Sequence, residues 1–220
     1  MIFPQLKNKI YGYINLNLEV REWLIKKDKL LAEKNPLLNP KTCQEMIMSV
    51  HEKYGLDFSY GGWMEDRSLL WKGSYLEEQN IFSHLGIDLN VPAGTEIAAD
   101  FNAEVIKIDT DYPRKGGWGS HVFLKHLSEP VCLIYAHLDP NIKCKVGDKL
   151  EKGQVFAVVG QAPQNGKWYP HIHIQVISDN HYKKLVKHDL WEAFDGYGKV
   201  EDIRRNSRKY PDPLRFISFV

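Results

Sequence analysis

Short apolar runs separated by turn residues fill the middle of this 220-residue chain and limit its fold more than any other feature. The runs recur between residues 84 and 176, and Gly- and Pro-containing turns such as residues 92–95 and 146–154 lie between them. Many short strands at regular spacing are typical of an all-β sandwich or roll. We therefore predict a mainly β domain over residues 76–180.

The segments on either side of this domain have a different pattern. Apolar residues recur at helical spacing between residues 16 and 31, and a second helix is expected between Pro40 and the stop signal Gly55. Residues 1–75 are therefore predicted to form a mostly helical N-terminal extension, which makes the fold α+β overall. Residues 181–220 are predicted to form a C-terminal extension packed on the β domain, with a short helix over 185–194.

One predicted strand, residues 170–176, carries two histidines on one side. Side chains alternate between the faces of a strand, so His171 and His173 point the same way, with Cα atoms roughly 6.6–6.8 Å apart. The intervening apolar residues face the other side and are expected in a core. A His-x-His pair on a rigid strand is either part of a metal site or a solvated strand face, and the motif alone is too short to decide.

Composition excludes several classes of protein. Lys and Arg number 29 and Asp and Glu number 28, so the net charge of +1 does not supply the basic surface that nucleic-acid binding usually needs. Three cysteines without a Cys-x-x-Cys motif predict neither a disulfide framework nor a zinc ribbon. No stretch reaches the roughly 18 apolar residues that predict a membrane span.

The N-terminus lacks the basic start and apolar run of a signal peptide. We expect a cytoplasmic location from the sequence as written, and a bacterial envelope location if an export signal is absent from it or export is non-classical.

A second pair of metal-binding residue types lies in the predicted strand at residues 84–89. His84 and Asp88 are separated by an even number of positions, which predicts that both lie on one strand face. Two imidazole nitrogens and one carboxylate oxygen form a three-ligand set suited to Zn²⁺, with the fourth position left for water. Calcium and magnesium fit poorly because they prefer oxygen ligands.

The remaining histidines are candidates for acid–base chemistry. A metal site made of three protein ligands leaves two histidines free for other tasks. These are His137, at the end of a predicted strand, and one member of the pair at 171 and 173. No His-Glu-x-x-His helix supplies the glutamate base that many zinc peptidases use. Histidine is the obvious substitute because its ordinary pKa lies near neutrality.

Five motifs, taken together and in order, resemble the lysostaphin-type (LytM-domain) zinc metalloendopeptidases over about residues 80–177. The motifs are His-x-x-x-Asp at 84–88, Pro-Ala-Gly-Thr at 92–95, Tyr-Ala-His-Leu at 135–138, Val-Gly-Asp-x-x-x-Lys-Gly-Gln at 146–154 and Pro-His-Ile-His at 170–173. The resemblance implies that His84, Asp88 and His173 bind Zn²⁺ and that His137 and His171 are catalytic. It also implies an antiparallel β fold with a groove across the sheet, and peptidoglycan cross-bridge peptides as substrate.

The sequence departs from this family next to the histidine pair. Residues 161–170 replace the family's Thr-Gly-x-x-Thr-Gly-Pro, and Ile174 replaces its Phe. The first change alters a wall of the expected groove and therefore bears on which peptide is preferred. Trp118, Trp168 and Tyr169 flank the expected site, where they either grip a peptide or pack the loops.

Three other interpretations compete with a zinc endopeptidase. A cupin would need a Glu soon after the His-x-His pair, where residues 174–177 have none. A lipoyl or biotinyl carrier shares the turn at 146–154 but needs a modified lysine at a hairpin tip. The third alternative is a non-catalytic zinc-binding regulator or peptide-binding module on the same scaffold. Such proteins typically lose metal ligands, and all five expected positions are present here.

Overall fold

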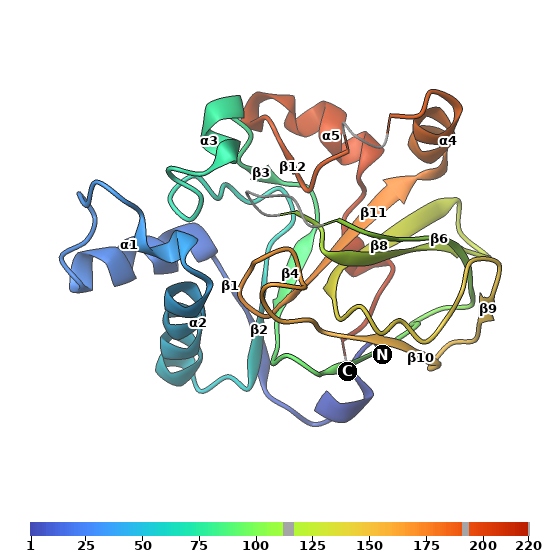
Figure 1. The fold of residues 1–220 in the computed structure, drawn as a ribbon, viewed down its shortest axis with the longest axis horizontal. Coiled ribbons are helices and arrows are strands. Elements are labelled where there is room, and N and C mark those ends of the chain that lie inside the picture. Colours follow the sequence, from blue (N-terminus) through green and yellow to red (C-terminus); the bar gives the residue numbers. More distant parts are fainter. Residues whose placement is uncertain (112–116, 191–193, 220) are drawn as a thin grey trace.

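A mixed sheet runs through most of the chain and forms the centre of the fold (Figure 1). The computed structural model describes residues 1–111, 117–190 and 194–219. Within these ranges eight strands form the sheet, and its neighbours are antiparallel except for the parallel pair β1 and β2. In spatial order the strands are β1 (Tyr11–Ile14), β2 (Phe58–Gly61), β4 (Ile87–Asn90), β11 (Ile172–Ser178), β8 (Val131–Leu138), β7 (Ser120–His126), β6 (Ala103–Thr110) and β9 (Lys149–Leu150).

Two small antiparallel sheets complete the β structure. One pairs β5 (Glu96–Ala98) with β10 (Val155–Val158), and the other pairs β3 (Ser83–His84) with β12 (Tyr197–Gly198). Ile97 of β5 and Phe156 of β10 belong to the same buried cluster as the apolar face of β4, β8 and β11. The main core therefore lies between the large sheet and the β5–β10 pair.

The apolar face of β11 lies in this core, as its alternating pattern predicts. Ile172, Ile174 and Val176 are each fully buried there. His173, which alternates with them, is consequently held on the opposite face of the strand, and His171 directly precedes the strand. The prediction of a mainly β fold, α+β overall, is confirmed.

The N-terminal segment contains the expected helices α1 (Leu16–Lys26) and α2 (Pro40–Tyr54). The side chain of Asn39 accepts hydrogen bonds from the first turn of α2, and Gly55 ends the helix in the left-handed conformation, with a φ of 64°. The prediction that apolar helical spacing continues to residue 31 is wrong. Helix α1 ends at Lys26, Asp28 has a left-handed φ of 53°, and Leu31 is 94% exposed.

Strands β1 and β2 were not expected in a mostly helical extension. They are only four residues each, and β2 pairs directly with β4, so the N-terminal segment extends the large sheet. Helices α1 and α2 pack over their own buried cluster, which includes Val20 and Met46. The division of the chain at 75/76 and 180/181 stays a prediction, and hydrogen bonding in the sheet continues across the first of these positions.

Helices of the C-terminal segment pack on the face of the sheet opposite the main core, whereas Ile217 and Phe219 near its end belong to that core. Helix α4 (Asp179–Lys187) contacts β8 and β11, and helix α5 (Ile203–Lys209) contacts β11. A short helix α3 (Tyr75–Gln79) precedes β3. The helix expected over 185–194 is wrong in its bounds, because α4 begins directly after β11 and Asp189 has a left-handed φ of 49°. Residues 191–193 lie outside the described residues. None of the helices described is both long and apolar enough to cross a membrane.

Candidate metal centre and its histidines

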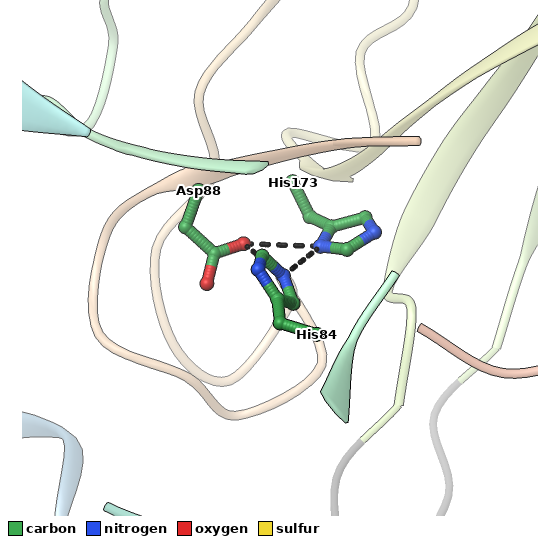
Figure 2. A group of neighbouring side chains, drawn as sticks. All are labelled: His84, Asp88 and His173. Carbon is green, nitrogen blue, oxygen red and sulfur yellow. Dashed lines mark hydrogen bonds and ion pairs between the residues drawn. The ribbon is translucent and has the colours of Figure 1, made fainter. Parts of the chain in front are cut away.

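The strands bring His84, Asp88 and His173 together, although they are far apart in the sequence (Figure 2). His173 of β11 lies directly opposite Asp88 of β4 in the antiparallel register, and its Nδ1 is 3.0 Å from Asp88 Oδ1. His84 Nε2 lies 2.9 Å from His173 Nδ1 and 3.2 Å from Asp88 Oδ1. All three side chains are buried, with exposures between 0% and 3%.

The expectation that His84 and Asp88 share one continuous strand is wrong. Strand structure is interrupted at Leu85 and Gly86, so His84 ends β3 and Asp88 belongs to β4. β3 pairs with β12 from the C-terminal segment, whereas β4 pairs with β2 and β11. The two side chains therefore meet because separate strands converge, and the even spacing alone does not place them.

Hydrogen bonds behind the imidazoles determine which nitrogen of each ring faces the cluster. His84 Nδ1 lies 3.0 Å from the carbonyl oxygen of Gly62, which can only accept, and 3.2 Å from Arg67 Nη2, which can only donate. We assign Nδ1–H to the shorter contact, to Gly62, which leaves the lone pair on Nε2. His173 Nε2 lies 3.1 Å from Gln175 Oε1, which leaves the lone pair on Nδ1. Two imidazole lone pairs and the Asp88 carboxylate then converge without a proton between them. Such a set calls for a cation, and its two nitrogens and one oxygen suit Zn²⁺.

His137 and His171 lie beside this cluster, as the resemblance implies. Their rings are 4.5 Å apart, and His171 Nε2 is 3.8 Å from Asp88 Oδ1. His137 Nδ1 donates to the Asn165 carbonyl at 3.0 Å, and His171 Nδ1 donates to the Tyr169 carbonyl at 2.8 Å. Each ring thus keeps a basic Nε2. His137 is also one of the few residues other than glycine with a left-handed φ, 64°, a strained conformation that often marks functional positions.

A small cavity of about 60 Å³ opens next to these histidines. Besides Asp88, His137, His171 and His173, the cavity is lined by Asp195, two glycines and five aromatic residues: Trp71, Tyr75, Trp118, Trp168 and Tyr197. Trp118 and Trp168 therefore do line the site, whereas Tyr169 is buried against His171 and its hydroxyl donates to Asn90. Trp71 and Tyr75 precede the β domain and Tyr197 follows it, so both extensions contribute to the walls.

Burial keeps the clustered histidines neutral. Desolvation lowers the pKa of His84 to about 4, against the opposing effect of the Asp88 charge, and the positive charge of Arg67 lowers it further. Desolvation is also the first cause of the lowered pKa values of His137 and His171. For Asp88, burial alone would raise the pKa, but the neighbouring histidines hold it well below 3.8. Neutral imidazoles beside a carboxylate are the protonation states that a metal site requires.

These shifts predict how the stability of the metal-free protein depends on pH. The unfolded chain protonates its histidines near pH 6.5, whereas folded His84 resists protonation until about pH 4. The unfolded state therefore binds more protons in this window, and the free energy of unfolding should fall as the pH is lowered from 6.5 toward 4. Urea denaturation of chelator-treated protein at pH 7.5, 6 and 5 measures this. Stability that stays constant or rises over the range would contradict the assignment of buried, neutral histidines.

Gly86 allows the His173 ring to take its position. A Cβ atom at Gly86 would lie 2.4 Å from the carbonyl oxygen of Ile174 and 2.7 Å from His173 Nε2. Gly86→Ala should therefore lower the free energy of unfolding by about 1–3 kcal/mol and weaken metal binding, because a backbone atom cannot give way cheaply. The control is Gly12→Ala in β1, where the nearest atoms are flexible Leu56 carbons at 3.3 and 3.4 Å. Equal effects of the two substitutions on zinc affinity would argue against this role of Gly86.

Among the site residues that the sequence analysis missed, two form hydrogen bonds with the candidate metal ligands. Gln175 lies two positions after His173 on the same strand face, so the period-two pattern that linked the histidines could have identified it. Arg67 is fully buried with its guanidinium against Asp88. Its local sequence, Glu65-Asp66-Arg67, is as compatible with a solvated cluster of charges as with a buried arginine, so it gave no signal.

Comparisons with a family model and with solved structures agree on one family of proteins. The model of the family described as "Peptidase family M23" matches residues 82–185. The catalytic domain of EnpA, a prophage-encoded M23 protein from Enterococcus faecalis solved as a mutant, is 30% identical over 44% of this chain and 68% of its own, with a TM-score of 0.36. LytU is 29% identical over 44% of this chain and 63% of its own, with a TM-score of 0.38.

A zinc-containing peptidase from Vibrio cholerae is 25% identical over 45% of this chain and 28% of its own, with a TM-score of 0.36. The chain thus spans less than two thirds of LytU and under a third of the Vibrio peptidase. A comparison with curated protein sequences gave no significant match. The matched segment contains all five candidate residues, while Arg67, Trp71 and Tyr197 lie outside it.

Proposed function

This chain belongs to peptidase family M23, and from that premise we propose that it is a zinc-dependent endopeptidase that hydrolyses peptide bonds in peptidoglycan cross-bridges or stem peptides. The observation that carries the proposal is the convergence of three lone-pair donors within 4.8 Å of one another, bordered by two further neutral imidazoles. A metallopeptidase needs both parts, a metal cage and acid–base groups beside it.

In this proposal His84 Nε2, Asp88 Oδ1 and His173 Nδ1 hold the zinc ion. When bound, zinc would supply Lewis acidity, which polarises a carbonyl group and makes water more acidic. The neighbours of the three ligands fix their orientation, because Gly62 and Gln175 determine which ring nitrogen is free. The donor set fits zinc without any side chain having to reverse its tautomer.

His137 and His171 carry the proton transfers. Both enter the reaction neutral, because burial lowers their pKa values, and both have Nδ1–H committed to a backbone carbonyl. Nε2 of one imidazole accepts the proton of the attacking water. The imidazolium so formed stabilises the oxyanion of the tetrahedral intermediate through a hydrogen bond from Nε2–H, and it then transfers that proton to the amine nitrogen as the C–N bond breaks. The two rings, 4.5 Å apart, share these tasks.

The same scaffold could serve a non-catalytic, zinc-binding regulator or peptide-binding module. All five expected side chains are present and converge, and His137, whose backbone is left-handed, lines the cavity, which favours an enzyme. A binding module has no need of a second, proton-accepting pair of imidazoles. We therefore retain the endopeptidase as the proposed function.

The test uses the full chain loaded with one equivalent of zinc and purified peptidoglycan as substrate. We expect new amino termini to appear with zinc and to stop appearing after chelation, and mass spectrometry of the products should identify the cleaved bond. If the protein binds a full equivalent of zinc but releases no amino terminus from peptidoglycan or its isolated peptides, the result would support the binding module instead.

A further inference from the structure

We propose that Arg67, which precedes the family-matched segment, is a positioning residue that fixes the Asp88 carboxylate so that one oxygen alone faces the metal. The inference rests on the proposed zinc site and concerns the part of the chain that the family match does not include. It assigns to the N-terminal extension a direct role in the geometry of the site.

The contacts of the Arg67 guanidinium divide the two oxygens of Asp88 between different tasks. Nη1 donates to Asp88 Oδ2 at 3.0 Å, and Arg67 is fully buried. The other oxygen, Oδ1, is the atom that faces His84 Nε2 at 3.2 Å and His173 Nδ1 at 3.0 Å. A buried carboxylate held by a charge-assisted hydrogen bond at Oδ2 cannot rotate to offer both oxygens to one ion.

The same guanidinium lies against the second candidate ligand. Arg67 Nη2 is 3.2 Å from His84 Nδ1, the nitrogen that also lies 3.0 Å from the Gly62 carbonyl. A guanidinium can only donate hydrogen bonds, so it cannot accept the Nδ1–H of His84. The guanidinium therefore packs against two of the three candidate ligands, Asp88 and His84, from the side away from the metal position.

Arg67 is itself fixed by the N-terminal extension. Its Nε lies 3.5 Å from Glu65 Oε1, and its backbone N–H donates to the Phe82 carbonyl. The Glu65 carboxylate in turn accepts the backbone N–H groups of Leu16 and Gly62, each at 2.6 Å. A row of charges, Glu65, Arg67 and Asp88, thus runs from the start of α1 to the candidate metal site.

Gly61 shows how closely the guanidinium is fitted. A Cβ atom there would lie 2.4 Å from Arg67 Nη2, closer than real Cβ contacts. Alanine at this position of β2 would therefore push the guanidinium without removing its charge. This gives a way to disturb the position of Arg67 while the arginine remains in the protein.

A purely structural ion pair would stabilise the fold without influencing the metal, so the test must separate the two roles. Arg67→Lys keeps the positive charge but loses the planar fork that spans Asp88 and His84. Arg205→Lys is the matched control, because Arg205 pairs with Asp202 at 2.6 Å on the exposed surface. Gly61→Ala is the second variant.

The experiment measures zinc affinity by competition with a chromophoric chelator, and the visible spectrum of the cobalt-substituted protein, for the wild type and the three variants. We expect 10–100-fold weaker zinc binding and a changed cobalt spectrum in Arg67→Lys, which is the usual effect of losing a group that orients a metal ligand. Gly61→Ala should change both readouts in the same direction, and Arg205→Lys should change neither.

Wild-type zinc affinity and an unchanged cobalt spectrum in either folded site variant would overturn the proposal. If Arg67→Lys does not fold, as judged by circular dichroism, Gly61→Ala decides the matter by itself. A wild-type chain that binds neither zinc nor cobalt would overturn the proposed function, and this proposal with it. Zinc binding by the wild type with no effect of the site variants would overturn the role of Arg67 alone.

Discussion

Replacing His173 with alanine is expected to abolish zinc binding and peptidase activity together. The substitution removes Nδ1, which lies 2.9 Å from His84 Nε2 and 3.0 Å from Asp88 Oδ1 at the centre of the cluster. Two ligands on separate strands, β3 and β4, would remain. Because a catalytic zinc site typically uses three protein ligands, we expect less than a tenth of an equivalent of zinc after dialysis and activity at background.

Metal analysis of dialysed protein together with amine release from peptidoglycan provides the measurement. His188→Ala is the control, since His188 is an exposed histidine at the end of α4 and should leave both quantities unchanged. A folded His173→Ala variant that retains a full equivalent of zinc would show that this imidazole is not a ligand.

Replacing His137 has a different expected result, which is normal zinc content with activity lost. Its ring centre lies 6.2 Å from that of His173, and its Nδ1 is committed to Asn165 O, so the zinc ligands stay in place without it. Loss of a positioned acid–base group typically costs about 10²–10⁴-fold in rate. We therefore expect kcat to fall by that factor.

Two substitutions are needed because His137 has a left-handed φ of 64°. Alanine is strained in that conformation, whereas asparagine tolerates it, so His137→Asn checks that any loss comes from the imidazole and not from the backbone. Zinc content and kcat are measured for both variants. Zinc loss as complete as in His173→Ala would assign His137 to the metal and reverse its role.

The β fold could be predicted because its signal is local. Strand β11 alternates isoleucine and valine with polar residues, and its apolar side chains are buried in the main core as that pattern requires. Helix α2 was predicted equally well because Asn39-Pro40 and Gly55 are strong start and stop signals. Strands β1 and β2 were missed because four-residue strands joined to a distant partner carry too little periodicity to recognise.

The histidines of the site could be found from motifs, but the way in which they meet could not. The even spacing of His84 and Asp88 suggested one strand, whereas the structure breaks at Gly86 and uses two. The contact that orients His84 comes from Gly62, which only the folded chain brings near, whereas Gln175 follows His173 on one strand face and could have been identified from the alternation. Arg67 is a similar case, because burial of a charge between two carboxylates is a tertiary property with no local pattern.

The most direct test of the zinc site is anomalous diffraction from crystals of the zinc-loaded protein, with data collected on both sides of the zinc absorption edge. We predict one strong peak enclosed by His84 Nε2, Asp88 Oδ1 and His173 Nδ1, with His137 and His171 beside it and outside bonding distance. A peak elsewhere, or none at this position under saturating zinc, would contradict the assignment of these three side chains as the metal ligands.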